Sequence, residues 1–178
     1  MSFAMINSLG CFGIDAYGVK VEADSDDSLP GFEVVGLPDA SVKESRDRVR
    51  AAIHNCGLEF PVSRITVNLA PADIRKEGPM YDLPIFMAVL LVSRQIDRVP
   101  EGSSFIGELS LSGEVRPVKG VLAMAIQARD LGYQSLFIPR ANSAEASVVD
   151  GLTIYAVDRV EEILDHITGK TELSPISA

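Results

Sequence analysis

The chain has 178 residues, with 47% hydrophobic and 23% charged side chains, which is the composition of one ordinary globular domain. Disorder, collagen and coiled coil are thereby excluded for most of its length, and two cysteines are too few for a disulfide-stabilised scaffold. The formal net charge of −9 argues against a surface devoted to duplex DNA.

The charge is uneven, since the first 60 residues carry 5 basic and 10 acidic side chains. Any surface that binds anions must therefore be local. The N-terminus lacks the basic and apolar regions of a signal peptide, and the longest apolar run, residues 84–92, is far shorter than the roughly 20 residues of a membrane span. With Cys11 and Cys56 interpreted as free thiols, these features predict a cytoplasmic protein that has no membrane partner.

The first predicted elements are the two strands of a hairpin, at residues 5–10 and 14–23. In the second strand Val19, Val21 and Ala23 alternate with Lys20 and Glu22, which is the period of a half-buried strand. An acidic, serine-rich loop at 24–30 and a third strand at 32–35 follow.

A helix is predicted next. Ser41 followed three residues later by Glu44 fits a capping box, and Gly57 supplies a stop after Cys56. The apolar positions of this helix form a stripe at helical spacing, made by Val42, Val49, Ala52, Ile53 and Cys56.

The other side of the predicted helix carries Lys43, Arg46 and Arg50, whose spacing of i, i+3 and i+7 places them on one face. Such a face is a candidate contact for the DNA phosphate backbone or for an acidic neighbouring subunit. Glu44 and Asp47 dilute its charge, so an ordinary solvated helix side is the alternative.

A strand at 65–69, a polar loop at 70–79 and a buried helix follow. This helix begins near Asp82, has Pro84 in its first turn and is apolar on all sides to Val92, which predicts a place in the centre of the core. The remaining predictions are a hairpin of 105–109 and 114–118, a helix at 120–131, a strand at 135–138, a short helix near 141–148, a strand at 153–157 and a helix at 158–167. Hairpins followed by alternating strands and helices predict an α/β domain with a mixed sheet and packed helices.

The candidate functional loop consists of Lys76, Glu77, Gly78, Tyr81 and Asp82, where a strand has ended and the buried helix begins. A helix N-terminus presents unpaired N–H groups and the positive end of the helix dipole, which suits an anion or a nucleophile. Lys76 would add positive charge there. The alternative is a structural loop in which Asp82 caps the core helix.

Other chemistry has no pattern in the sequence. There is no GxxxxGK[ST] loop and no GxGxxG after a strand. His54 and His166 are far apart and lack metal-ligand spacing, and neither accompanies a GxSxG elbow. The sequence therefore predicts no metal site and no cofactor bound by this chain.

Four segments closely resemble the N-terminal domain of the ComM/YifB-type magnesium-chelatase-related AAA+ ATPases. They are residues 35–53 (VGLPDASVKESRDRVRAAI), 65–73 (ITVNLAPAD), 76–85 (KEG and YDLPI) and 107–113 (GELSLSG). The resemblance implies one Lon-like or ChlI-like domain at 1–168, followed at 169–178 by a linker toward an ATPase module. It also implies the ribosomal-protein-S5-domain-2-like fold of the Lon proteolytic domain and of the C-terminal domain of RadA.

The resemblance further implies that peptidase chemistry is absent. Lon-type peptidases carry a serine in a Lys-Asp-Gly-Pro-Ser-Ala-Gly stretch and a lysine after Gly-Gly-Leu, and Met80 and Leu122 occupy these positions here. A thioether is no nucleophile and leucine is no base, so no catalytic residue is expected. The alternative, a residual serine- or threonine-type peptidase, requires Ser41 or Ser110 within hydrogen-bond reach of Lys119 in an open cleft.

For the whole protein, the resemblance implies a ring-forming, hexameric ATPase that uses ATP and Mg²⁺ in DNA processing, with ComM proteins acting in natural transformation. The expected role of this chain is that of a non-catalytic accessory domain for oligomer assembly or for positioning DNA or a partner. A DNA-binding module acting through the Lys43, Arg46 and Arg50 face is a further alternative.

Overall fold

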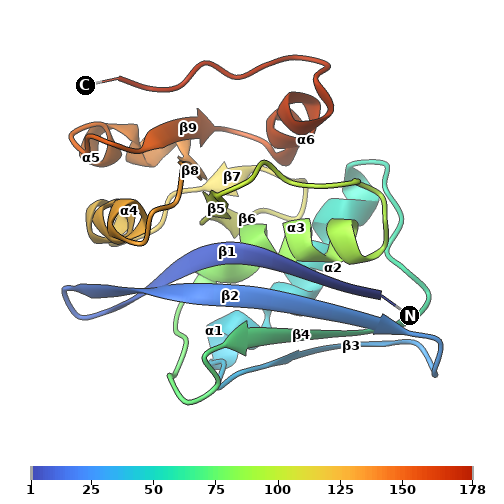
Figure 1. Cartoon of the computed structure of the whole chain (residues 1–178). Helices are drawn as coiled ribbons and strands as arrows, with labels where there is room; N and C mark the ends of the chain where they lie inside the picture. The colour runs from blue at the N-terminus through green and yellow to red at the C-terminus, as the bar shows by residue number, and fades with distance from the viewer. Residues whose placement is uncertain (1, 178) are drawn as a thin grey trace.

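A seven-stranded sheet organises the fold in the computed structural model, which describes residues 2–177 (Figure 1). Its strand order is β3-β4-β2-β1-β5-β8-β9. The strands are β1 (Ser2–Phe12), β2 (Asp15–Asp26), β3 (Gly31–Val35), β4 (Arg64–Ala70), β5 (Ser103–Phe105), β8 (Ser135–Pro139) and β9 (Thr153–Val157). β1 and β4 pair antiparallel with β2, and the other pairings are parallel, which confirms an α/β fold with a mixed sheet.

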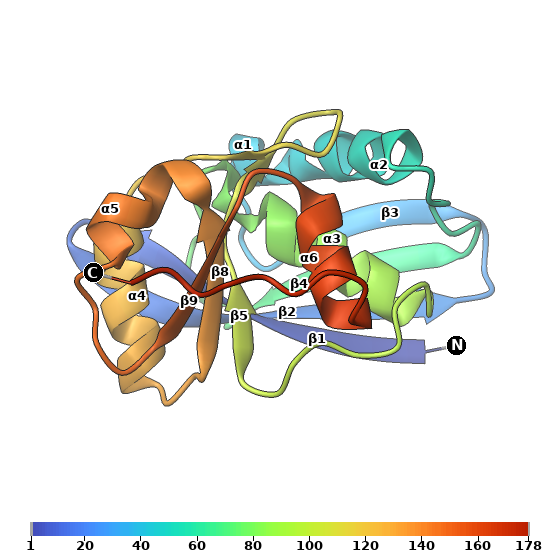
Figure 2. The same cartoon turned by 90° about the horizontal axis from the view of Figure 1, so that it is seen from above.

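Helices pack against this sheet, and a separate two-stranded ribbon lies beside it. The helices are α1 (Ala40–Lys43), α2 (Ser45–Asn55), η1 (Pro79–Tyr81, 3₁₀), α3 (Asp82–Val92), α4 (Val121–Asp130), η2 (Arg140–Asn142, 3₁₀), α5 (Ser143–Ala146) and α6 (Val160–Thr168), and the ribbon is β6 (Glu108–Leu109) with β7 (Val115–Arg116). α3 packs against β1, β2 and α2, whereas α4 contacts β1 and β2 nearer the hairpin turn (Figures 1 and 2).

The prediction of a central helix at 82–92 is confirmed. Ten of the eleven residues of α3 are buried, because its sequence offers no polar face apart from Asp82. The strand predictions at 32–35, 65–69, 135–138 and 153–157 are also confirmed to within about a residue at each end.

The β1–β2 hairpin is longer than expected. Its register runs from Ser2↔Ser25 to Phe12↔Asp15, so β2 continues to Asp26, through the start of the predicted acidic loop. β4 also pairs with this part of β2, as in Asp24↔Thr66. Strand pairing on both sides outweighs the low strand preference of aspartate here.

The prediction that Ser41 caps the first helix is wrong. Asp39 is the cap, and its Oδ1 accepts a hydrogen bond from the Val42 N–H (2.8 Å). The helical segment is also interrupted at Glu44, which separates α1 from α2. Asp is as good a cap as Ser, and Asp39, whose backbone is still extended, directly precedes the first helical residue, Ala40.

The hairpin predicted at 105–109 and 114–118 is largely wrong. Phe105 belongs to β5, in the main sheet between β1 and β8, and only the short β6 and β7 pair as a ribbon. The Ile106 N–H donates to Phe137 O (3.1 Å) and the Gly107 N–H donates to Met80 O (2.9 Å), so both residues bond to other parts of the chain.

The sheet has a narrow seam in its middle, where β1 and β5 share the single registered pair Asn7↔Ser104. Two side chains strengthen it. Asn7 Nδ2 donates to Ser103 O (3.1 Å), and the buried Ser8 Oγ donates to Phe105 O (2.7 Å).

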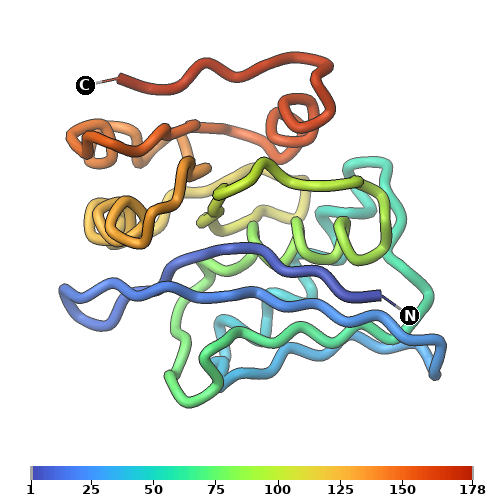
Figure 3. The backbone as a smooth tube through the Cα atoms, in the orientation of Figure 1, coloured from blue at the N-terminus to red at the C-terminus, as the bar shows by residue number. Residues whose placement is uncertain are grey.

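The C-terminal segment turns back after α6 and crosses the molecule beside β9 (Figure 3). The Leu173 N–H donates to His166 Nδ1 and the Ile176 N–H donates to Ile154 O, both at 2.9 Å. The Leu173 and Ile176 side chains pack, half-buried, against the core. In this structure the C-terminal segment therefore packs on the domain. That it links the domain to a further module stays a prediction.

Candidate functional site

A cleft of about 550 Å³ lies between the β1–β2 hairpin, the loop before α3 and the start of α4. It is lined by Cys11, Gly13, Asp39, Ser41, Glu77, Gly78, Pro79, Met80, Glu108, Pro117, Val118, Lys119 and Gly120. Met80, which the resemblance assigns to the position of the Lon-type nucleophile, forms part of its wall. Leu122, which the resemblance assigns to the position of the Lon-type lysine, lies in the first turn of α4, two residues beyond Gly120.

The cleft holds no Ser–Lys pair within residues 2–177. Ser41 and Lys119 both line it, but no hydrogen bond joins Ser41 Oγ to Lys119 Nζ in this range. Ser110 lies outside the lining, and its Oγ accepts from the Glu114 N–H (2.9 Å). The contact that a residual peptidase requires is therefore missing from the described residues.

Lys76 does not present its charge to an anion, contrary to the expectation for the candidate loop. Its side chain is fully buried, and Nζ donates to the carbonyl oxygens of Gly36 (2.9 Å) and Pro71. Its backbone also bonds to Leu37 and Asp39 on the β3–α1 connection. Burial lowers the pKa of the Lys76 ammonium, and the side chain ties two loops together.

Asp82 does not cap α3, which is a second correction, because Tyr81 stands at the cap position and Asp82 is the first helical residue. Its fully buried carboxylate accepts from Arg48 Nε (2.6 Å) and Nη2 (3.1 Å), from Ser45 Oγ, and from the Leu109 N–H (3.0 Å). Burial raises the pKa of this carboxyl group, and the hydrogen bonds oppose the rise. Asp82 thus joins α2, α3 and β6.

The sequence pattern missed Arg48. It lies between Arg46 and Arg50 on α2 but points off their face, and its partner is 34 residues away along the chain. The Arg48 side chain is only one-fifth exposed. No local spacing signals such a pair.

Tyr81 is buried, and its hydroxyl has no hydrogen-bond partner among the described residues. Burial raises the pKa of this phenol. A Cβ at residue 10 would lie 2.3 Å from the Tyr81 hydroxyl oxygen and 2.8 Å from Cζ of Tyr17, so the close approach of both rings requires Gly10.

The candidate loop therefore divides into two parts. Glu77 and Gly78 line the cleft, whereas Lys76, Tyr81 and Asp82 are buried in the structure beneath it. Only the first part is accessible to a ligand.

The predicted basic face is partly engaged within the chain. Lys43 is exposed and lies on α1, while Arg46 and Arg50 belong to α2. Arg46 Nη1 is 3.6 Å from Glu33 Oε2, and the Arg50 guanidinium carbon is 4.4 Å from the centre of the Phe60 ring. Two of the three cations therefore already have partners.

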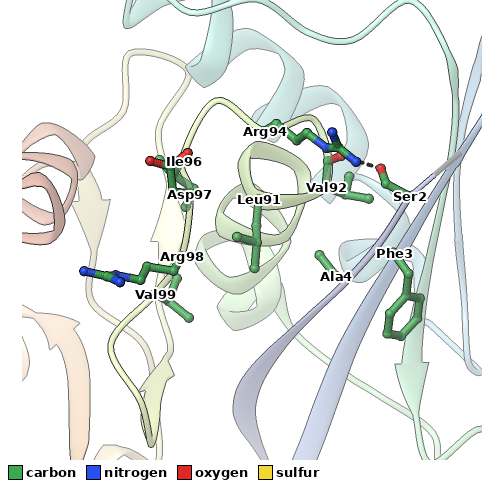
Figure 4. Close-up of a pocket in the computed structure, with 10 residues that line it drawn as sticks. All are labelled: Ser2, Phe3, Ala4, Leu91, Val92, Arg94, Ile96, Asp97, Arg98 and Val99. Carbon is green, nitrogen blue, oxygen red and sulfur yellow. Dashed lines mark hydrogen bonds between the residues drawn. The ribbon is translucent and has the colours of Figure 1, made fainter.

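A second hollow, of about 490 Å³, lies where β1 begins and α3 ends (Figure 4). Arg94 and Arg98 line it, and Ser2 Oγ donates to Val92 O (2.7 Å) at its edge. None of the residues singled out in the sequence belongs to its lining.

Residues 2–177 contain no group of three or more His, Cys, Asp or Glu side chains arranged to hold a metal ion. Within the same range, every helix is too short or too polar to cross a membrane.

Comparisons with known proteins relate the chain to an ATPase family. The profile of the family "Subunit ChlI of Mg-chelatase" matches residues 21–142. The competence protein ComM of Haemophilus influenzae is 39% identical over 174 residues, which is 97% of this chain and 34% of ComM. YifB of Escherichia coli is 38% identical over 175 residues, again 97% of this chain and 34% of the relative.

A more distant similarity fits the fold. The Lon protease of Mycolicibacterium smegmatis is 27% identical over 168 residues, which is 88% of this chain and 21% of that protein. Together with the mixed sheet and its packed helices, this similarity confirms the expected Lon-like fold. The chain spans about a third of the length of ComM and YifB. It belongs to the ComM/YifB-type, magnesium-chelatase-related family of AAA+ proteins.

Proposed function

We propose that this chain is a non-catalytic accessory domain of a ComM-type AAA+ ATPase, which serves assembly of the oligomer or positions DNA or a partner protein. The observation that carries the proposal is the pair Met80 and Leu122 beside a cleft in which no serine is bonded to Lys119 within the described residues. The resemblance assigns these two residues to the positions of the Lon-type nucleophile and base, and neither side chain can supply either role.

The length relation to the relatives supports the same role. Because the chain matches only about a third of ComM, ATP and Mg²⁺ would be handled by the other two thirds of such a protein. Proteins of this ATPase family commonly form oligomers. A domain without catalytic residues would contribute binding surfaces. In a ring, one weak contact per subunit is repeated in every subunit, so the contacts together bind much more strongly than one alone.

The proposal is tested on the full-length protein and on the same protein lacking residues 1–168. We expect both proteins to hydrolyse ATP. In sedimentation, we expect the truncated protein to form assemblies of fewer subunits than the full-length protein. Incubation of the full-length protein with an unfolded substrate protein should yield no cleavage products.

Two variants make the test decisive. Proteolysis that Ser41→Ala or Lys119→Ala abolishes, and that the control Ser28→Ala leaves unchanged, would establish a residual peptidase and overturn the proposal. Assembly and partner binding that are both unaffected by the truncation would also overturn it.

A further inference from the structure

Exposed apolar side chains gather at one end of the molecule. At the turn of the β1–β2 hairpin, which lies at the same end of the molecule as α4 and α5 (Figure 1), Phe12 is 73% and Ile14 is 92% exposed. α4 contacts the same hairpin, and its outer side presents Leu122 and Ile126. Clustered apolar side chains of this kind mark contacts between proteins more often than free surface.

An apolar hollow of about 490 Å³ opens on the same hairpin, on β2 and β4. Its lining consists of Gly18, Lys20, Ala70, Pro71, Leu131 and Tyr133. The hollow depends on the glycine, because a Cβ at residue 18 would lie 3.0 Å from Leu131 Cδ1. One positive charge stands at its rim, where Lys20 Nζ donates to Asn7 Oδ1 (2.6 Å) and Tyr133 Oη (3.2 Å).

We propose that two copies of this chain pair about a two-fold axis, with the hairpin tip of each copy, Phe12 and Ile14, inserted into the hollow of the other. Gly18 lies on β2, four residues after Ile14 in the turn, and is therefore at most about 13 Å from it. When two such hairpins lie antiparallel across one another, both tips meet both hollows at once. This is the self-complementary pattern of a two-fold contact.

The charges agree with this partner. Asp15 follows the tip directly and is exposed, so in the pair it approaches Lys20 at the rim of the other copy's hollow. A second copy therefore offers both the apolar insert and the opposite charge that the hollow requires. The inference rests on the proposed assembly role and adds to it a contact that joins copies in pairs, so closure of a ring would use other surfaces.

The first experiment is sedimentation equilibrium of the 178-residue chain over a wide concentration range. We expect a reversible monomer–dimer equilibrium. The double variant Phe12→Ser/Ile14→Ser should weaken dimerisation about tenfold or more, because the inserted side chains are lost. Val62→Ser is the matched control, since Val62 is 85% exposed but lies in the loop between α2 and β4.

The second experiment mixes two defective chains. Gly18→Leu fills the hollow and leaves the tip intact, so alone it should remain monomeric. Mixed with Phe12→Ser/Ile14→Ser, whose hollow is intact, it should form a heterodimer through the one remaining tip–hollow contact. Leu131→Asp places a charge in the hollow and serves as a second variant if Gly18→Leu unfolds.

Three results would overturn the inference: a wild-type chain that stays monomeric or forms larger rings, a tip variant that dimerises like wild type, or a mixture without heterodimers. These failures are separable from failure of the proposed function. If the isolated chain is monomeric while full-length assembly still requires residues 1–168, the accessory role stands and only this pairing is lost.

Discussion

At the scale of single residues, buried charges decide how this domain packs. Asp82 accepts hydrogen bonds from residues of α2 and from the backbone of β6, while Lys76 bridges two loops through carbonyl oxygens. Both side chains belong to the loop that the sequence singles out as a ligand site. Their charge and their position in the sequence favour a ligand-binding role. Their structural role becomes visible only through partners that are distant along the chain, 34 residues for Asp82 with Arg48 and 40 residues for Lys76 with Gly36.

Removal of the Asp82 carboxylate should be costly. Asp82→Ala leaves the Arg48 guanidinium and the Leu109 N–H without their shared acceptor, and we expect a loss of about 3–5 kcal/mol in the free energy of unfolding in urea. Glu33→Ala removes the exposed partner of Arg46 and should cost at most about 1 kcal/mol. Equal losses in the two variants would contradict the central role of Asp82.

The thiol of Cys56 gives a pH-dependent prediction. Burial, followed by the nearby Glu161 carboxylate, raises the pKa of Cys56 from 9.0 to about 11, against the opposing charge of Arg159. Only the thiolate is alkylated, so at pH 8 the thiolate fraction of Cys56 is about a hundredfold smaller than that of an ordinary thiol. The alkylation rate of Cys56 should therefore rise about tenfold per pH unit until the pH approaches the pKa.

The measurement is iodoacetamide labelling of the Cys11→Ser variant, in which Cys56 is the remaining cysteine. The same variant unfolded in urea is the control and should react at the rate of an ordinary thiol. A native rate equal to the unfolded rate at pH 8 would show that burial does not protect this sulfur.

At the scale of elements, the sequence predicts best where one signal dominates. α3 is recognisable because eleven residues in a row contain one polar side chain, at its first position. The start of the first helix is harder to predict because Asp39 and Ser41 are both good cap residues. The place where the extended backbone ends decides between them, and it ends at Asp39. β5 has only three residues, Ser103–Phe105, and its place in the main sheet depends on β1 and β8, which no local pattern reveals.

The C-terminal segment yields a prediction at this scale. A chain that ends at Gly169 loses the half-buried Leu173 and Ile176 side chains and the hydrogen bond to Ile154 O. We expect its free energy of unfolding to fall by about 2 kcal/mol, measured by urea denaturation. A truncated chain as stable as the full one would show that this segment is a free linker.

At the scale of the whole molecule, the net charge of −9 opposes binding to a polyanion, and the Arg46 and Arg50 charges are partly engaged within the chain. We expect the isolated chain to bind a labelled duplex no more tightly than about 10⁻⁴ M at physiological salt, measured by fluorescence anisotropy. Tighter, salt-sensitive binding that Lys43→Glu weakens, and the control Lys170→Glu does not, would favour the DNA-binding alternative.

The cleft shows the limits of sequence reasoning for the whole molecule. Resemblance to a family assigns Met80 and Leu122 to the peptidase positions, and the structure places the first in a cleft wall and the second near its edge. Which polar side chains face that cleft depends on how the hairpin, the loop before α3 and the start of α4 meet. Glu77 and Lys119 reach it whereas Lys76 does not, although nothing in their spacing separates them.

The seam between β1 and β5 has a consequence for the order in which the chain folds. Residues 2–92 build every strand of the main sheet on one side of it, and residues 103–177 build the strands on the other. Each half is thus one continuous stretch whose strands find partners locally, and such pairings close at a lower entropic cost than distant ones. The single pair Asn7↔Ser104 and the packing of α4 on β1 and β2 then join two partly formed halves, so the slowest step of folding is expected at the seam.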